Sequence, residues 1–371
     1  MNRRVVHLSS AHPAEDTRIF VKECRTLAAA GYDTHIVIST AHGYEKDGVK
    51  FHALAQRPGR FYRMCVKPLH AYRAVRALAP DVLHVHEPDL LPLAWLFARR
   101  GVHVIYDSHE DLPRQIPYKD WIPAPLRGPI ARIVEWFEDG ICRSLAGVVA
   151  ATPHIADRFY KAGVNAVCVA NFPNLSELAM PAGESWDARE KSVAYIGTIS
   201  VERGVNELLQ AAKIADVKIH IAGFPHPAAL GETLKSAHER GEIVYHGAIS
   251  RDAVLDLMRT LRGGIVCFHP LPNHVDAQPN KLFEYMSAGL PVIASHFPLW
   301  REIIEKSGCG ICVDPNKPRA IAEAIRYILD HDWDAKAMGE RGQNAVRERY
   351  NWEVQADILL AFYRDILKEA V

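Results

Sequence analysis

Short runs of β-branched and other apolar residues alternate with amphipathic helical segments along almost the whole chain. Runs of this kind are typical strands, and their nearly continuous apolar character indicates parallel sheets covered by helices on both faces. In the first half the predicted strands are Val5–Ser9, Thr34–Ile38, Val82–His86, His103–Asp107, Val148–Ala151 and Ala166–Val169. In the second half they are Ser192–Gly197, Lys218–Gly223, Ile243–His246, Gly264–Phe268, Pro291–Ala294 and Gly310–Val313. The alternation therefore predicts an α/β fold built from doubly wound parallel sheets.

The alternation breaks between residues 171 and 185, where two prolines, a glycine and several polar residues interrupt the periodicity. A chain of 371 residues is too long for one ordinary core, so this segment is the expected linker between two domains. We place the first domain at residues 1–175 and the second at 190–350, with residues 351–371 as a terminal helix that crosses back to the first domain. Ligands of doubly wound sheets bind at the carboxyl ends of the strands, and the site is expected there.

Composition narrows the classes of protein to which the chain can belong. Lysine plus arginine equals aspartate plus glutamate, 44 against 44, which argues against a general nucleic-acid-binding protein. The apolar runs are shorter than the roughly 18 to 20 residues that span a bilayer. The apolar stretch after Arg3 and Arg4 is too short for a signal peptide, so we expect a cytoplasmic protein.

The segment from Asp276 to Ser295 combines features that suit a nucleotide. Pro279 favours the first turn of a helix, whose unpaired backbone N–H groups form an anion site. Lys281 adds a positive charge there, and Glu284, one turn further on, can accept hydrogen bonds from a vicinal diol such as a ribose. Phosphate donors followed by a diol acceptor match a nucleoside diphosphate. A surface helix with a solvated lysine and glutamate is the alternative with the same spacing.

A second loop of phosphate-binding character follows the strand that ends at Gly197. The backbone can approach a ligand closely at Gly197, and Arg203 supplies a cation where the next helix starts. A surface arginine that binds nothing is the alternative for Arg203.

Polar residues also follow two strands of the first half, at the edge of the sheet where ligands bind. His109 and Glu110 come directly after the strand His103–Asp107, and His86 ends the strand Val82–His86 and can help to shape a cleft. A histidine titrates near neutrality, so position 109 alone suggests a general base. Glu110 can equally well cap the segment that follows it.

The loop after the first strand contains Asp16, which is expected to cap the following helix. Arg18 would then lie in the first turn, where the helix dipole disfavours a positive charge, so an anionic partner such as a phosphate is indicated. His84 and His86 lie two residues apart on a strand and raise the question of a metal. The sequence offers no clear third ligand, so we expect no metal site.

The run from Pro279 to Ala294 resembles the signature of the retaining glycosyltransferases of group one (family four). The similarity extends over nearly the whole chain, and it implies the GT-B fold, two Rossmann-like domains that face each other across a cleft. It also implies a first domain that binds the acceptor and a second that binds the nucleotide sugar. In that family an acidic residue, seven intervening residues and a glutamate mark the donor site. By this resemblance Asp276 contacts the donor sugar and Glu284 the ribose.

The resemblance implies roles for the remaining candidates. Thr198 stands where the family usually has a first cation for the diphosphate, and Arg203 keeps the second. His109 and Asp276 hold the donor sugar, in a front-face substitution in which the departing phosphate takes the proton of the acceptor. The residues assigned to donor binding are Gly197, Thr198, Arg203, Asn280, Lys281, Leu282 and Glu284. Those assigned to the acceptor or phosphate side are Arg18, Asp16, Glu110 and His86.

The implied reaction is transfer of a hexose-type sugar from a UDP- or GDP-linked donor to a glycan or lipid-linked acceptor, without metal or other cofactor. Assembly of surface polysaccharide or glycolipid is the expected setting. The basic and aromatic stretch Arg57–Arg76 predicts a peripheral contact with the inner face of the cell membrane, with a solvated helix face as the alternative. Two other classes stay open, a nucleotide-sugar epimerase of the same fold and a catalytically inert partner that binds sugar nucleotides.

Overall fold

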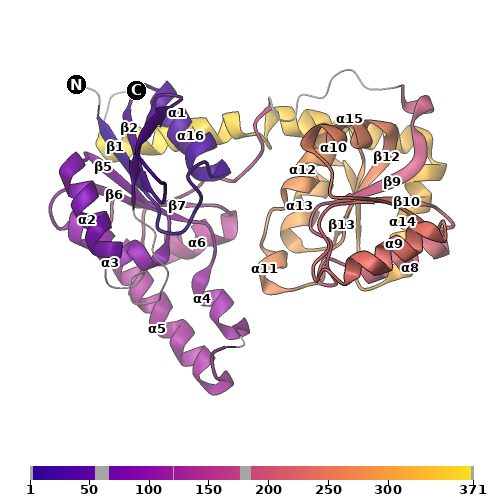
Figure 1. The fold of residues 1–371 in the computed structure, drawn as a ribbon, viewed down its shortest axis with the longest axis horizontal. Helices are drawn as coiled ribbons and strands as arrows, with labels where there is room; N and C mark the ends of the chain where they lie inside the picture. Colours follow the sequence, from indigo (N-terminus) through magenta and orange to yellow (C-terminus); the bar gives the residue numbers. More distant parts are fainter. Residues whose placement is uncertain (1–2, 55–66, 120, 176–184, 369–371) are drawn as a thin grey trace. The chain divides into compact units, whose positions relative to one another are not determined.

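The computed structural model describes residues 3–54, 67–119, 121–175 and 185–368. The chain forms two compact units, one from Met1–Asn171 with Trp352–Val371 and the other from Phe172–Asn351. Each unit is a parallel sheet with helices on both faces (Figure 1), which confirms the predicted fold class. Among the described residues, no helix is both long enough and apolar enough to cross a membrane.

The described sheet of the first unit has the strand order β3-β4-β2-β1-β5-β6-β7-β8. Its strands are β1 (Arg4–Leu8), β2 (Asp33–Ile38), β3 (Tyr44–Lys46), β4 (Val49–Ala53), β5 (Val82–Val85), β6 (His103–Ser108), β7 (Gly147–Ala150) and β8 (Ala166–Cys168). Neighbouring strands run parallel apart from β3 and β4. The carboxyl ends of β1, β5 and β6 therefore lie side by side, which brings the segments that follow them together.

The β3–β4 hairpin was not predicted from the sequence. Asp47 and Gly48 turn the chain between the two strands, with φ of 51° and 75°. Positive φ at both central residues is the geometry that an Asp-Gly turn adopts in a tight hairpin. The run Tyr44–Lys46 is short and charged, so a search for apolar strands does not detect it.

The helices of the first unit begin with η1 (Thr17–Cys24), an eight-residue π-helix. The Asp16 carboxylate accepts hydrogen bonds from the backbone N–H groups of Arg18 and Ile19, so the predicted N-cap is present. π-Helical turns are rare and are found frequently at functional sites. The other helices are α1 (Arg25–Ala29), α2 (Lys67–Leu78), η3 (Pro88–Leu90), α3 (Leu91–Ala98), α4 (Leu112–Gln115), η4 (Ile116–Tyr118), α5 (Ala124–Cys142) and α6 (Pro153–Lys161).

The terminal helix α16 (Trp352–Leu367) belongs to the first unit. Its apolar side packs against the sheet face formed by Val5, Val82, Ile105 and Val149. The contact is close at β7, because a Cβ added at Gly147 would lie 2.5 Å from the Phe362 ring. Residues at the two ends of the chain thus share one core.

The described sheet of the second unit has the order β11-β10-β9-β12-β13-β14, and its strand pairs are parallel. The strands are β9 (Glu190–Ile196), β10 (Ile219–Ala222), β11 (Ile243–Gly247), β12 (Leu261–Val266), β13 (Val292–Ser295) and β14 (Gly310–Val313). The helices are η5 (Trp186–Ala188), α8 (Val205–Ala215), α9 (Leu230–Glu239), α10 (Arg251–Thr260), α11 (Pro272–Val275), α12 (Asn280–Ser287), α13 (Pro298–Ser307), α14 (Pro318–Asp330) and α15 (Asp332–Glu348). Because β9 and β12 are neighbours, the loops that follow them lie at one edge of the sheet.

Candidate active site

The start of α12 holds the predicted nucleotide-binding residues of the second unit. Pro279 is the N-cap residue, Asn280 is exposed, and Leu282 is buried beneath the helix. The Glu284 side chain is buried, and its Oε2 atom forms ion pairs with Lys281 Nζ and with Arg251 Nη1, the latter at 2.8 Å. Both ion pairs end on one oxygen, so the carboxylate is held in place by two cations.

Sequence analysis missed Arg251. It is the first residue of α10, directly after Ser250, whose hydroxyl accepts a hydrogen bond from the Ala253 N–H group and caps that helix. A capping serine marks a helix start, but it does not say that the following side chain reaches Glu284, 33 residues away. Only the tertiary fold, which puts the start of α10 within reach of α12, brings the two together.

The loop after β9 is fixed by glycines and by a tyrosine. Gly204 has φ of 74°, and a Cβ there would lie 2.2 Å from the Cys267 carbonyl oxygen, so no other residue fits this backbone. Tyr195 Oη lies 3.2 Å from the carbonyl oxygens of both Thr198 and Arg203. The Arg203 guanidinium lies over the Phe268 ring, 5.0 Å from its centre. The loop from Gly197 to Gly204 is therefore a defined structure with an exposed Thr198.

Two predicted segments of the second unit are connected directly. Tyr285 of α12 is fully buried, and its hydroxyl accepts a hydrogen bond of 2.9 Å from the Ile196 N–H group, one residue before Gly197. The structure thus brings the Gly197 loop and the start of α12 to the same edge of the sheet. Asp276 is exposed and follows the short helix α11.

In the first unit, Arg18 and Asp107 form a buried ion pair. Arg18 Nε and Nη2 donate hydrogen bonds of 2.9 and 2.8 Å to the two Asp107 oxygens, and Nη1 donates one of 2.8 Å to the Val169 carbonyl. Burial opposes ionisation of Asp107, but the charge of Arg18 outweighs it and holds the pKa of this carboxyl well below its usual value. Arg18 is thus committed to protein partners, which differs from the phosphate contact that the sequence suggested. The helix dipole disfavours a positive charge at this helix start, and the Asp107 carboxylate compensates for it.

His109 lies beside the same Asp107 oxygen that Arg18 Nε and His86 Nδ1 contact. Its Nε2 atom is 3.5 Å from Asp107 Oδ2, and its ring stacks at 5.6 Å on that of His86. Burial lowers the pKa of His109 to about 4, so the imidazole is neutral at physiological pH. A neutral imidazole suits a group that orients a substrate through a hydrogen bond. Glu110, the next residue, is exposed.

A second histidine, His12, lies beside His109 with a distance of 5.2 Å between ring centres. Its Nδ1 atom is 2.8 Å from Glu87 Oε1, and this hydrogen bond raises the pKa of His12. Glu87 also accepts a hydrogen bond of 2.9 Å from the Ser10 N–H group and so orders the loop after β1. The pairing of these two residues could not be predicted, because a histidine and a glutamate 75 positions apart carry no spacing signal.

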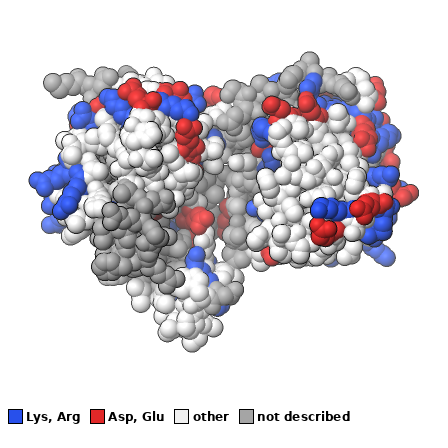
Figure 2. Space-filling model, viewed as in Figure 1, with Lys and Arg blue, Asp and Glu red and all other residues white. Residues whose placement is uncertain are grey.

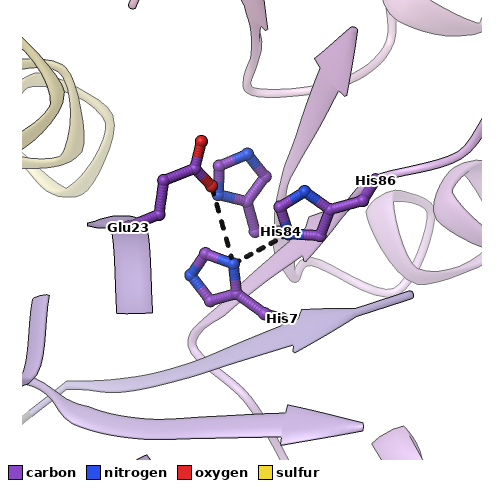
Figure 3. Close-up of side chains that lie close together, drawn as sticks. All are labelled: His7, Glu23, His84 and His86. Atoms are coloured by element: carbon purple, nitrogen blue, oxygen red, sulfur yellow. Dashed lines mark hydrogen bonds and ion pairs between the residues drawn. The ribbon is translucent and has the colours of Figure 1, made fainter. Parts of the chain in front are cut away.

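Beneath these residues, three histidines and a glutamate form a fully buried cluster (Figure 3). His7 of β1 and His84 of β5 are paired neighbours in the sheet, His86 follows two residues later, and Glu23 comes from η1. His7 Nδ1 and His86 Nε2 are 2.9 Å apart, and His86 Nδ1 lies 3.1 Å from Asp107 Oδ2. His86 is therefore a buried link between the cluster and Asp107, in contrast to the cleft-lining position that the sequence suggested.

Comparison with known protein families accounts for most of the chain. Residues 179–345 match the model described as "Glycosyl transferases group 1", and residues 18–174 match the model described as "Glycosyl transferase 4-like domain". The two matches meet near the boundary between the two units.

Curated relatives are distant. A phosphatidyl-myo-inositol mannosyltransferase of Mycobacterium leprae is 24% identical over 77% of this chain and 74% of its own length. An alpha-D-kanosaminyltransferase of Streptomyces kanamyceticus is 24% identical over 47% of this chain. A GDP-mannose:cellobiosyl-diphosphopolyprenol alpha-mannosyltransferase of Xanthomonas oryzae is 27% identical over 50% of this chain. The chain spans about half the length of the last two, 45% and 50%.

Solved structures with little sequence identity share the fold. A sucrose-phosphate synthase from Thermosynechococcus elongatus superposes with a TM-score of 0.76 at 18% identity and covers 100% of both chains. Anabaena HepE, solved in complex with UDP, has a TM-score of 0.71 at 11% identity and covers 98% of this chain and 100% of its own. At these identities the superpositions establish the fold alone.

Proposed function

Because the chain belongs to the group 1 glycosyl transferases, a retaining family of GT-B fold, we propose that it transfers a hexose-type sugar from a nucleoside diphosphate donor to an acceptor. The anomeric configuration is retained. The second unit binds the donor and the first unit binds the acceptor. The observation that carries this proposal is the Glu284 carboxylate, held by Lys281 and Arg251 at the N-terminal turn of α12.

The charges around α12 support the donor assignment. Glu284 Oε2 takes both ion pairs, so Oε1 is the oxygen that accepts hydrogen bonds from a ribose diol. The first turn of α12 presents backbone N–H groups to a diphosphate, and the Lys281 ammonium group adds a positive charge next to them. Arg203 is the cation of the neighbouring loop, and Thr198 beside it contributes a hydroxyl.

In the first unit, His109 orients the donor sugar. Its pKa of about 4 keeps the ring neutral, and the ionised Asp107 beside it stabilises positive charge that develops in the transition state. The departing phosphate accepts the proton of the acceptor hydroxyl, so no separate general base is required. In the second unit, the exposed Asp276 contacts the donor sugar. Glu110, with its exposed carboxylate, contributes to the acceptor side.

The acceptor that we propose is lipid-linked, and the support lies on α5. Leu126, Ile133, Trp136 and Phe137 are exposed and follow a helical spacing, so they form one apolar stripe. Arg132 on this helix is exposed as well. In Figure 2 the surface at the α4–α5 end of the first unit is mostly uncharged, with a few basic side chains. An apolar stripe with exposed cations suits the interface of an anionic membrane.

The acidic residues of α5 point away from that stripe. Glu135 pairs with Arg114, and both Glu138 and Asp139 pair with Arg158. All three carboxylates of α5 are thus paired with arginines, and none of them adds an unpaired negative charge to the apolar stripe. We therefore place the peripheral membrane contact on α5. Of the stretch Arg57–Arg76, where the sequence suggested this contact, residues 57–66 lie outside the described residues.

The experiment that tests the donor assignment is calorimetric titration with UDP, GDP, ADP, dTDP and CMP. We expect one diphosphate to bind, and Glu284→Gln and Arg251→Ala to weaken its binding about 10- to 100-fold, as loss of a hydrogen bond to a charged group does. Glu302→Gln on the exposed side of α13 is the matched control and should bind normally. Binding that is unchanged in Glu284→Gln would overturn the ribose assignment.

Product analysis with the nucleotide sugar of the base so identified separates the three classes of function. Transfer requires an acceptor and yields a glycoside. An epimerase would convert the nucleotide sugar without any acceptor, and an inert partner would bind it without turnover.

A further inference from the structure

We propose that His7, Glu23, His84 and His86 form a binding site for one divalent transition-metal ion of the zinc type. This inference concerns the interior of the first unit and does not depend on the proposed function. Sequence patterns alone do not predict it, because His84 and His86 make only two ligands. The fold supplies the other two from β1 and η1.

The geometry of the four side chains matches a first coordination shell. Each offers one ligand atom, and these atoms all lie within 4.8 Å of one another. Two ligands at zinc-bond lengths of about 2.0–2.1 Å from a tetrahedral ion lie roughly 3.3 Å apart. The separations of His7 Nδ1 from His86 Nε2, 2.9 Å, and from Glu23 Oε2, 3.9 Å, bracket that value. Small side-chain movements would therefore complete the shell.

The groups behind the histidines fix their orientation as metal ligands require. His86 Nδ1 lies 3.1 Å from Asp107 Oδ2, and His84 Nδ1 lies 2.8 Å from Tyr363 Oη on α16. When Nδ1 carries the proton, the lone pair is on Nε2, which is how outer hydrogen bonds orient metal-binding histidines. The Nε2 atom of His84 is buried and has no hydrogen-bond partner among the described residues. An ion would supply that partner.

The charges of the cluster leave a place for a cation. Glu23 and Asp107 are two fully buried carboxyl groups, and Arg18 contributes one positive charge within 3.1 Å of Glu23 and 2.8 Å of Asp107. Both Glu23 oxygens are buried without a hydrogen-bond partner among the described residues, and one Arg18 charge faces two carboxyl groups. A metal ion would supply both a partner for Glu23 and a second positive charge.

A closed set of three imidazoles and one carboxylate is characteristic of a structural site, because no position is left open for a substrate. The ion would join β1, β5 and η1. It would also fix His86 against Asp107, and Asp107 in turn lies against His109. The four ligands are thus positioning residues for the neighbouring polar edge, and they touch no substrate.

The test measures metal in the untagged, full-length chain, both as purified and after titration with Zn²⁺ or Co²⁺. We expect about one ion per chain that survives gel filtration, and a Co²⁺ form with the visible absorption of a tetrahedral site. His84→Gln and Glu23→Gln should lose the ion. His35→Gln, which alters a stacked histidine pair elsewhere in the unit, is the matched control and should keep it.

Tyr363→Phe removes only the hydroxyl that orients His84. This variant provides the test of the site if the ligand variants fail to fold. It should weaken Zn²⁺ binding at least 10-fold, the usual effect of losing an outer-shell partner. Folded wild-type protein that takes up neither Zn²⁺ nor Co²⁺ would overturn the proposal and leave the cluster as a proton-sharing network. Stoichiometric metal that persists in both His84→Gln and Glu23→Gln would overturn it too.

Discussion

Arg18 and Asp107 form a two-hydrogen-bond ion pair, with distances of 2.9 and 2.8 Å, between a π-helix and the end of β6. Both side chains are buried, and 89 residues separate them in the sequence. The pair connects the loop after β1 to the strand that carries His109. It therefore fixes Asp107, the carboxylate whose Oδ2 atom lies 3.5 Å from His109 Nε2.

Breaking this pair should destabilise the first unit strongly. Asp107→Asn removes the carboxylate that accepts two hydrogen bonds from the buried Arg18 and leaves Glu23, 3.1 Å away, as its remaining acidic neighbour. Loss of one partner of a buried ion pair costs about 3–5 kcal/mol in comparable cases. Urea denaturation followed by circular dichroism would measure the loss. The exposed pair Arg301–Glu305 is the control, since breaking it by Glu305→Gln should cost no more than about 1 kcal/mol. Equal effects of the two substitutions would contradict the role assigned to the buried pair.

His109 should make the folded state sensitive to acid. Its pKa is about 4 in the folded chain, against the 6.5 that is usual for a histidine. As the pH falls below about 6.5, the unfolded chain binds a proton that the folded chain does not, so stability is lost down to about pH 4, by up to roughly 3 kcal/mol. His109→Gln should reduce the slope of unfolding free energy against pH across this window, to which the buried His7 and His84 also contribute because burial lowers the pKa of both. A slope that is unchanged in His109→Gln would refute the assignment.

Gly204→Ala should disrupt the loop that carries Arg203. The backbone φ of 74° disfavours any Cβ, and the added carbon would lie 2.2 Å from the Cys267 carbonyl oxygen. Strain of this kind costs about 1–3 kcal/mol before the clash is counted. Thermal unfolding and nucleotide titration should both show a loss. Gly140→Ala in α5 meets no atom within 4 Å and should be neutral or stabilise by about 0.5–1 kcal/mol.

Removing the apolar stripe of α5 should weaken binding to anionic vesicles without unfolding the chain. Ile133 and Trp136 are 64% and 75% exposed, so the double substitution Ile133→Ser/Trp136→Ser removes little buried area. We expect at least 10-fold weaker co-sedimentation with vesicles that contain phosphatidylglycerol. Trp333→Ser, at a tryptophan that is 80% exposed on α15, is the control and should bind as the wild type does. Wild-type protein that fails to bind such vesicles would rule out this surface as a membrane contact.

The sequence determined the fold class, because strands buried on both faces and helices with one apolar face are local patterns. The family signature from Pro279 to Ala294 was equally local, and the chain keeps it within one helix and the following strand. The Asp16 cap could be predicted for the same reason, since a cap bonds to backbone groups two and three residues away. Each of these depends on neighbours in the chain.

Which charged residues meet depends on the three-dimensional fold. Arg18 had the signature of an anion contact, and the fold supplied Asp107 as the anion. Arg251 reaches Glu284 from another helix, and His7 and Glu23 join His84 and His86 from another strand and helix. Such pairs are set by strand order and helix packing over tens of residues. Such pairs cannot be recognised in the local sequence. The electrostatic free energy that favours one pairing over another becomes large only when burial removes water from both partners.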